Sequence, residues 1–204
     1  MSTEVPIAKA PNRARGVQRV AELLDAGAAL FAEYGYEATT MTQIANRAGA
    51  SIGSLYQFFP TKEVLAESLY GRYVETMTTR FEELAKRASR MSPTRLADHL
   101  VDLMLEVRSD RDAAAALSGA VAGIIERRKL MRGAARRQIA AILRATNPRL
   151  TEKAAAEAAA MIGHALKIVP TLAKEEEDEG QALVAQARKM LAGYLGLLMN
   201  PKRS

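Results

Sequence analysis

Apolar residues recur every three or four positions along almost the whole chain, which is the spacing of one face of an α-helix. Alanine, leucine, glutamate, lysine, arginine and methionine dominate the composition, and runs of β-branched residues do not occur. These residue types favour helix over strand. The pattern therefore predicts an all-α fold of about nine helices without a β-sheet.

The first helix should end near Gly35, a residue suited to the left-handed turn at a helix C-terminus. Its apolar stripe is Val17, Val20, Leu24, Ala28 and Phe31. Two short helices should follow, because Thr40 and Gln43 have the spacing of a capping box. After a glycine-containing turn, Ser51 is a suitable N-cap for the next helix, which must end before Pro60.

In the rest of the chain, the spacing of apolar residues predicts longer helices. They are expected over about residues 61–90, 94–107, 120–145, 152–169 and 181–199. A polar break at residues 108–112 should precede an additional Ala-rich helix. Pro170 should either end the helix before it or kink it.

The composition argues against several kinds of chemistry. The chain has no cysteine and only two histidines, His99 and His164, so disulfides and metal sites are not expected. No apolar run approaches the roughly 18 residues of a membrane-spanning helix, and the N-terminus lacks the apolar segment of a signal peptide. We expect a soluble, cytoplasmic protein with no membrane partner, no metal and no cofactor.

The formal net charge of +6 suits a polyanionic partner, but the charges are unevenly spread. A basic block covers residues 127–149, and five consecutive acids occupy residues 175–179. Charge alone therefore does not locate a nucleic-acid site. Arg128, Arg132 and Arg136 recur every four residues, and they are either solvated or paired with the acidic run of the same or a partner subunit.

Two short helices joined by a glycine-containing turn are the arrangement of a helix-turn-helix, whose second helix enters the DNA major groove. Leu55, Phe58 and Phe59 share one face of the second short helix and should pack inward. The outward face then contains Ile52, Gly53, Tyr56 and Gln57. An ordinary helical corner with an exposed polar face fits the same periodicity equally well.

From about Arg19 to Tyr70 the chain closely resembles the TetR family of bacterial transcriptional regulators. The matching stretch is "AGAALFAEYGYEATTMTQIANRAGASIGSLYQFFPTKEVLAESL". Its family features are a phenylalanine and a glycine closing the first helix, paired hydroxyls before "IA", "AG" followed by a serine, and a leucine-tyrosine pair. The sequence departs from the family where Gln57 and Phe58 stand at positions that are often aromatic or histidine, and where Pro60 precedes Thr61. These departures affect which operator is read.

The resemblance implies that Thr40, Thr42, Tyr56 and Lys62 hold the DNA backbone. It also implies that bases are read at Ile52, Gly53, Ser54 and Gln57, and the Ser51 hydroxyl is of a kind that reaches phosphate. The expected domains are a flexible basic arm at 1–16, a helix-turn-helix DNA-binding domain at 17–70 with its motif at about 40–59, and a helical effector-binding and dimerisation domain at 71–204.

Aromatic and methionine side chains at inward spacings make a small-molecule pocket conceivable in the second domain. The candidates are Tyr73, Met77, Phe81, Met104, Met131, Met161 and His164. A plain hydrophobic core has the same pattern.

The last two helices carry apolar stripes that suit close helix packing. The stripes include Ala155, Ala159, Ile162, Leu166, Leu183, Ala187, Leu191 and Tyr194. Buried against the rest of the subunit they would be core. The family resemblance suggests instead that these helices pair with their copies across a twofold axis into a four-helix bundle.

These observations predict a ligand-responsive transcriptional regulator, not an enzyme, and more specifically a dimeric repressor released from a palindromic operator by a small molecule. The alternative is an all-helical enzyme or small-molecule carrier that keeps the fold without DNA binding. Residues 49–53 also satisfy G-x-S-x-G, the nucleophile elbow of α/β-hydrolases. That interpretation is rejected because the elbow needs a strand before the serine, and residues 43–48 are predicted to be helical.

Overall fold

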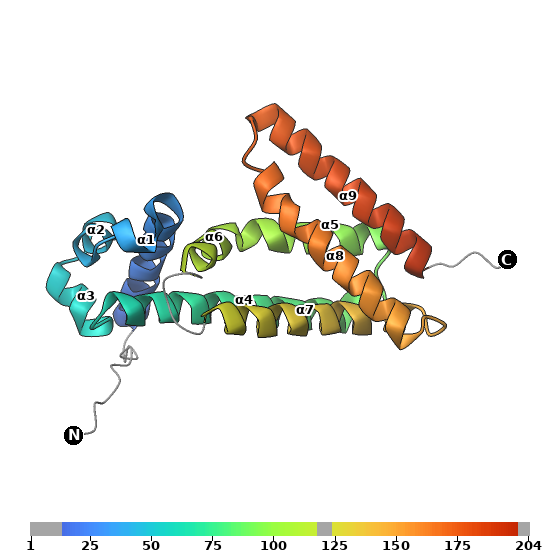
Figure 1. Cartoon of the computed structure of the whole chain (residues 1–204), viewed down its shortest axis with the longest axis horizontal. Coiled ribbons are helices and arrows are strands. Elements are labelled where there is room, and N and C mark those ends of the chain that lie inside the picture. Colours follow the sequence, from blue (N-terminus) through green and yellow to red (C-terminus); the bar gives the residue numbers. More distant parts are fainter. Residues whose placement is uncertain (1–13, 118–123, 200–204) are drawn as a thin grey trace, which may run out of the picture. The chain divides into compact units, whose positions relative to one another are not determined.

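The structure is a computed structural model that describes residues 14–117 and 124–199 of the 204-residue chain. Those two ranges contain nine helices and no strand (Figure 1). The helices are α1 (Ala14–Ala38), α2 (Met41–Arg47), α3 (Ile52–Phe58), α4 (Lys62–Ala88), α5 (Pro93–Glu106), α6 (Arg108–Ala116), α7 (Ile124–Thr146), α8 (Glu152–Leu172) and α9 (Glu177–Met199). The prediction of an all-α fold with about nine helices is confirmed.

The chain forms two compact units. The first comprises the segments Met1–Glu75 and Ser109–Arg127, and the second comprises Thr76–Arg108 and Arg128–Ser204. The first unit contains α1, α2, α3 and nearly all of α6, the second contains α5, α8 and α9, and α4 and α7 contribute to both. The predicted boundary near residue 70 stays a prediction, and residues 1–13 of the predicted basic arm lie outside the described residues.

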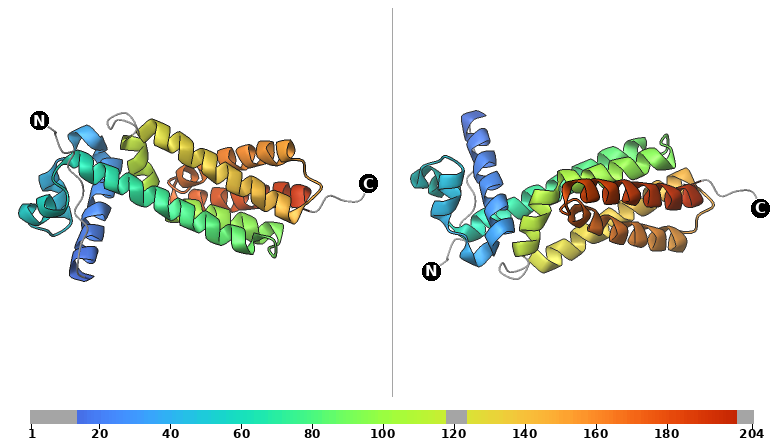
Figure 2. Two further views of the ribbon diagram at one scale, coloured as in Figure 1. Left: turned by 90° about the horizontal axis from the view of Figure 1, so that it is seen from below. Right: turned by 90° about the horizontal axis from the view of Figure 1, so that it is seen from above.

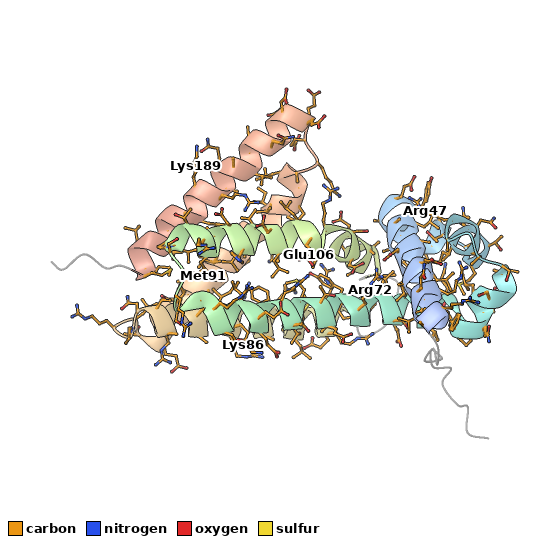
Figure 3. All side chains as sticks on the ribbon, turned by 180° about the vertical axis from the view of Figure 1, so that it is seen from behind. Arg47, Arg72, Lys86, Met91, Glu106 and Lys189 are labelled. Atoms are coloured by element: carbon orange, nitrogen blue, oxygen red, sulfur yellow. The ribbon has the colours of Figure 1, made fainter. Side chains whose placement is uncertain are left out.

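The first unit is held together by apolar burial and by one three-helix ion cluster. Leu23 and Phe31 of α1 are fully buried, as are several side chains of α4. Arg72 of α4, labelled in Figure 3, lies 2.6 Å from Asp25 of α1 and 2.6 Å from Asp110 of α6. A guanidinium with two separate donor nitrogens is suited to linking two carboxylates in this way.

In the second unit, α5 packs against α8 and α9, and α8 and α9 lie side by side in both views of Figure 2. Leu96 and Leu100 of α5 are buried in this core. Arg188 of α9 forms ion pairs with two aspartates of α5, Asp98 at 3.4 Å and Asp102 at 2.5 Å. The ion pairs and the apolar core together connect α5 to α9.

Two local predictions were wrong, and one alternative for Pro170 is excluded. Residues 108–112 are not a polar break, because α6 already begins at Arg108. Pro170 does not end α8, which continues to Leu172. The last helix begins at Glu177, within the acidic run and before residue 181, because carboxylates in a first turn interact favourably with the helix dipole.

The predicted start of the long helix near residue 120 lies outside the described residues. None of the helices in the two described ranges is long and apolar enough to span a bilayer.

Candidate nucleic-acid interface

Helix α2 begins with a complete capping box. The Thr40 hydroxyl accepts a hydrogen bond from the backbone N–H of Gln43 at 3.2 Å, and the Gln43 side chain accepts one from the backbone N–H of Thr40 at 2.8 Å. Two N–H groups that a helix start leaves unpaired are thereby satisfied. The start of α2 is therefore determined by the local sequence.

The turn between α2 and α3 depends on one glycine. Gly49 has φ +58°, in the left-handed region that favours glycine. The N–H of Ala50 donates to the carbonyl of Ala45 at 2.9 Å, which closes the turn. Ser51 then caps α3 by accepting from the N–H of Ser54 at 3.2 Å. Ser51 thus follows a helix and a turn, not a strand, which agrees with rejecting the hydrolase motif.

Two side chains anchor α3. Leu55 and Phe59 are 0% and 1% exposed, and Ile44 of α2 is also fully buried. Phe58, which was expected to pack fully inward, is only half-buried. Because α3 has seven residues, these few buried contacts fix its orientation.

The opposite face of α3 is open to solvent. Ile52 and Tyr56 are 41% and 48% exposed, Gly53 and Gln57 are exposed, and Ser54 is half-buried. No atom lies within 4 Å of a Cβ added at Gly53, so a large partner can approach the backbone there. No charged residue lies between Arg47 and Lys62 in the sequence. The recognition face, defined as Ile52, Gly53, Ser54, Tyr56 and Gln57, thus offers hydrogen-bonding groups without charge.

Of the other predicted DNA-contacting residues, Thr40, Thr42 and Ser51 are exposed around the recognition face. Thr40 and Ser51 use their hydroxyls as helix caps. The predicted residues of α2 and α3 are therefore brought together on consecutive elements of one unit, whereas Lys62 lies at the start of α4.

Lys62 has a structural task that the sequence did not reveal. Its ammonium donates to the backbone carbonyls of Tyr36 at 2.9 Å, Glu37 at 3.4 Å and Thr39 at 3.1 Å. It also lies 4.3 Å from the centroid of the Tyr36 ring. A cation at a helix C-terminus satisfies carbonyls that have no helical partner. Lys62 thus closes the end of α1, where Gly35 leaves the helical conformation with φ +82°.

The same corner contains a hydrogen bond between Tyr36 and Glu63. The Tyr36 hydroxyl donates to the Glu63 carboxylate at 2.9 Å. The backbone N–H of Glu63 lowers the pKa of this carboxyl most, and the Tyr36 hydroxyl lowers it further. Burial is the main reason that the pKa of Tyr36 is raised far above its usual range. At neutral pH Tyr36 is therefore a donor and Glu63 an acceptor.

Two arginines attach α1 to the motif. Arg19 donates to the backbone carbonyl of Ala48 in the turn at 3.3 Å. Arg47 of α2, labelled in Figure 3, pairs with Glu33 of α1 at 3.0 Å. Neither contact was predicted, because the partners lie 29 and 14 residues apart and nothing local in the sequence indicates the pairing.

The predicted ligand residues do not form one site. Met77 and Phe81 line a cavity of about 40 Å³, together with Met131 of α7. Met161 is 60% exposed and His164 is exposed, so both lie on the outer surface of α8. Tyr73 and Met104 are buried without lining this cavity.

Most of the predicted dimer stripe faces the interior of the chain itself. The buried members are Ala155, Ala159, Ile162, Leu166, Ala187 and Leu191. Leu183 and Tyr194 are half-buried. The dimer-interface assignment is corrected for the six buried residues, because side chains already covered within one subunit offer almost no surface to another. These six residues instead belong to the hydrophobic core of the subunit, which was the other interpretation of the stripes.

Helices α2 and α3 thus have the arrangement of a helix-turn-helix, and one face of α3 is exposed. Residues 23–69 match the bacterial regulatory proteins of the tetR family. Residues 23–69 therefore form a TetR-type N-terminal domain.

Two curated relatives are similar to about a third of this chain. The A-factor receptor protein of Streptomyces griseus is 37% identical over 71 residues, which cover 35% of this chain and 25% of that protein. The transcriptional repressor KstR2 of Mycobacterium tuberculosis is 39% identical over 66 residues, which cover 32% of this chain and 33% of the repressor. The matched stretch spans a third or less of these relatives.

Solved structures extend the likeness in fold to nearly the whole chain. A transcriptional regulator from Aquifex aeolicus aligns with a TM-score of 0.68 and 19% identity, covering 88% of this chain and 99% of that one. SmeT in complex with triclosan aligns with a TM-score of 0.62 and 21% identity, covering 86% of this chain and 90% of that one. At these identities the likeness concerns the fold alone.

Proposed function

We propose that this chain is a ligand-responsive transcriptional repressor that binds a palindromic DNA operator as a homodimer and is released by a small molecule. The recognition face of α3 carries this proposal. It is exposed, uncharged and rigidly anchored from behind by Leu55 and Phe59. Side chains that read base edges in the major groove need exposure and a fixed position, because their hydrogen bonds must replace those of water.

The roles within the motif follow from geometry. Gln57 and Ser54 offer amide and hydroxyl groups to base edges, and Gly53 permits close approach. The Tyr56 and Thr42 hydroxyls suit phosphate oxygens, which position the protein without reading sequence. A relative that matches 32% of this chain, KstR2 of Mycobacterium tuberculosis, is named a transcriptional repressor, and this supports repression as the outcome of binding.

Dimerisation is proposed through the outer faces of α8 and α9. Met161 and Ile168 lie seven residues apart on α8 and are 60% and 51% exposed. Met190 and Leu197 have the same spacing on α9 and are 58% and 75% exposed. Seven residues return to the same side of a helix, so the two apolar side chains of each pair lie on one side of their helix. Pairing these stripes across a twofold axis would bury them in a four-helix bundle.

A dimer would also supply specificity that one short helix lacks. Two α3 helices related by a twofold axis read two half-sites spaced about 34 Å, one DNA turn, which gives the operator its palindromic symmetry.

Release by a small molecule is proposed as a population shift between two conformers. The cavity beside Met77 and Phe81, about 40 Å³, has room for little more than water, whereas ligand pockets occupy roughly 300–1,000 Å³. An effector there would have to displace the methionine side chains, which are flexible enough to move. A surface hollow of about 350 Å³, bounded by Leu105, Val184 and Arg188, is the alternative entry point. The triclosan complex of SmeT supports the general idea of a small-molecule effector.

The test is selection of bound DNA from a random pool by the parent protein and by Tyr56→Ala, at two salt concentrations. The parent should enrich a palindrome, and Tyr56→Ala should weaken binding to it by about tenfold or more. Tyr34→Ala is a matched control, because Tyr34 is an exposed tyrosine, 56% exposed, on α1. Failure of a folded parent to enrich any sequence at low salt would contradict the proposal and favour the enzyme or carrier alternative.

A further inference from the structure

The first turn of α3 carries an apolar side chain that none of the DNA contacts proposed above uses. Ile52 directly follows the N-cap Ser51 and is 41% exposed. Between Met41 and Phe58, the exposed large apolar side chains are Ile52 and Tyr56. Tyr56 has a hydroxyl for a polar partner, whereas Ile52 has no polar side-chain atom. Covering Ile52 with an apolar group would therefore be favourable, because it removes apolar surface from water.

The outside of α3 is divided into two rows. Ile52 and Tyr56 form one row, because residues four apart lie on the same side of a helix. Gly53 and Gln57 form the neighbouring row in the same way. A Cβ added at Gly53 would meet no atom within 4 Å, so the surface beside Ile52 is open. Leu55 is fully buried and holds the helix from behind, which gives the outward side chains fixed positions.

The side chain of Ile52 is also stiff. A β-branched residue in a helix has one strongly preferred χ1 rotamer. It therefore loses little conformational freedom when a partner covers it, and this loss is one of the costs of binding. A flexible side chain would adapt to many surfaces, whereas a stiff and anchored isoleucine suits contact with one apolar group at a defined place.

We propose that Ile52 reads a thymine in each operator half-site by packing against the C5-methyl group of that base. The inference rests on the proposed function, because it requires α3 to enter the major groove. Base edges in that groove present hydrogen-bond donors and acceptors, and the thymine methyl is the apolar group among them. Phosphate oxygens are poor partners, since an aliphatic side chain would displace their water without replacing its hydrogen bonds. Ile52 is thus a specificity-determining residue.

The competing partner for Ile52 is the deoxyribose at the edge of the groove, which also presents apolar C–H groups. A sugar contact is the same at every base pair and carries no sequence information directly. A methyl contact exists only where thymine occurs. Replacing thymidine by deoxyuridine separates the two, because it removes the methyl group and leaves every hydrogen-bonding group of the base unchanged.

The experiment uses the full chain and the palindrome selected from the random pool. Each thymine of a half-site is replaced in turn by deoxyuridine, first in one half-site and then in both. At one position the replacement should weaken binding of the parent about fourfold in one half-site and about fifteenfold in both. In Ile52→Ala the same replacement should change the affinity by less than about twofold, because the side chain that meets the methyl is missing.

Two variants are matched controls. Ser54→Ala removes a different side-chain group from the recognition face, and Val17→Ala removes apolar surface from α1, where Val17 is 56% exposed. Both should keep the full deoxyuridine effect. Urea denaturation checks that Ile52→Ala is folded, as its exposed position leads us to expect.

The methyl contact and the proposed function fail in different ways. The methyl contact would be overturned if no deoxyuridine replacement weakened binding, or if the weakening persisted in Ile52→Ala, and the repressor proposal would stand. An equal loss of affinity by Ile52→Ala for the operator and for unrelated DNA would indicate a sugar contact and would also overturn it. Failure to select any sequence would contradict the proposed function, and the methyl contact with it.

Discussion

The recognition face of α3 and the outer faces of α8 and α9 are both exposed, but they present opposite kinds of surface chemistry. On α3, exposed Ile52 and Tyr56 alternate with glycine, serine and glutamine. On α8 and α9, the exposed stripes consist of methionine, isoleucine and leucine. The first surface exchanges hydrogen bonds with water for hydrogen bonds with a partner, whereas the second gains free energy by removing apolar area from water.

The two surfaces also differ in what holds them in place. The seven-residue α3 depends on Leu55 and Phe59 for its orientation. The 21 and 23 residues of α8 and α9 are fixed by long buried stripes on their inner sides. A single core substitution should therefore disturb the recognition face more than the outer faces. Partner binding at the outer faces should instead be sensitive to single surface substitutions.

The largest effect is expected from removing the main anchor of α3. Leu55→Ala should lower the free energy of unfolding by about 3 kcal/mol, because it leaves a cavity at a fully buried position. Ile52→Ala is the matched control on the same helix, and at 41% exposure it should cost less than about 1 kcal/mol. Urea denaturation measures both values. Equal losses would show that α3 is not anchored as described.

The next largest effect tests the outer face of α9. Leu197→Glu should raise the dimer dissociation constant about a hundredfold, or about 2.7 kcal/mol, because it places a charge in an apolar contact. The unfolding free energy of the isolated subunit should change little, since Leu197 is 75% exposed. Analytical ultracentrifugation measures the dissociation constant.

Ala185→Glu is the control for this substitution. It adds the same carboxylate at an exposed position on another side of α9. A similar loss of dimer in both variants would mean that net charge, and not the stripe, controls association. A parent protein that stays monomeric would remove the dimer proposal.

The smallest effect sharpens the role of Lys62. Lys62→Met should lower the unfolding free energy by about 1–2 kcal/mol, because three carbonyls at the end of α1 lose their donor. Lys86→Met, at the exposed end of α4, should have almost no effect. If Lys62 instead holds DNA, the slope of log affinity against log salt should fall by about 0.9. An unchanged slope with reduced stability would identify a purely structural residue.

Much of the N-terminal domain could be predicted because its signals are local. Thr40, Ser51 and Gly49 act within a few residues of themselves as caps and a turn, so their roles are visible in the sequence. The inward position of Leu55 follows from helical spacing. The structural roles of Lys62, Arg19 and Arg47 could not be predicted, because each contacts a residue that is distant in the sequence.

The C-terminal helices show the opposite situation. In α8 and α9 apolar residues occupy more than one side, so periodicity identified helices but not which stripe is buried. Ile162 and Leu166 are buried, whereas Met161 and Ile168 are exposed, although all four are apolar.

The sequence by itself determined that this protein is all-α, where most helices begin and end, and that it carries a TetR-type motif, because capping, turn formation and helical spacing act over a few residues. Only the tertiary structure decided which sides of α8 and α9 face outward and that Lys62 donates to the carbonyls at the end of α1. These features depend on contacts between helices, whose free energy is set by packing in three dimensions and not by neighbouring residues.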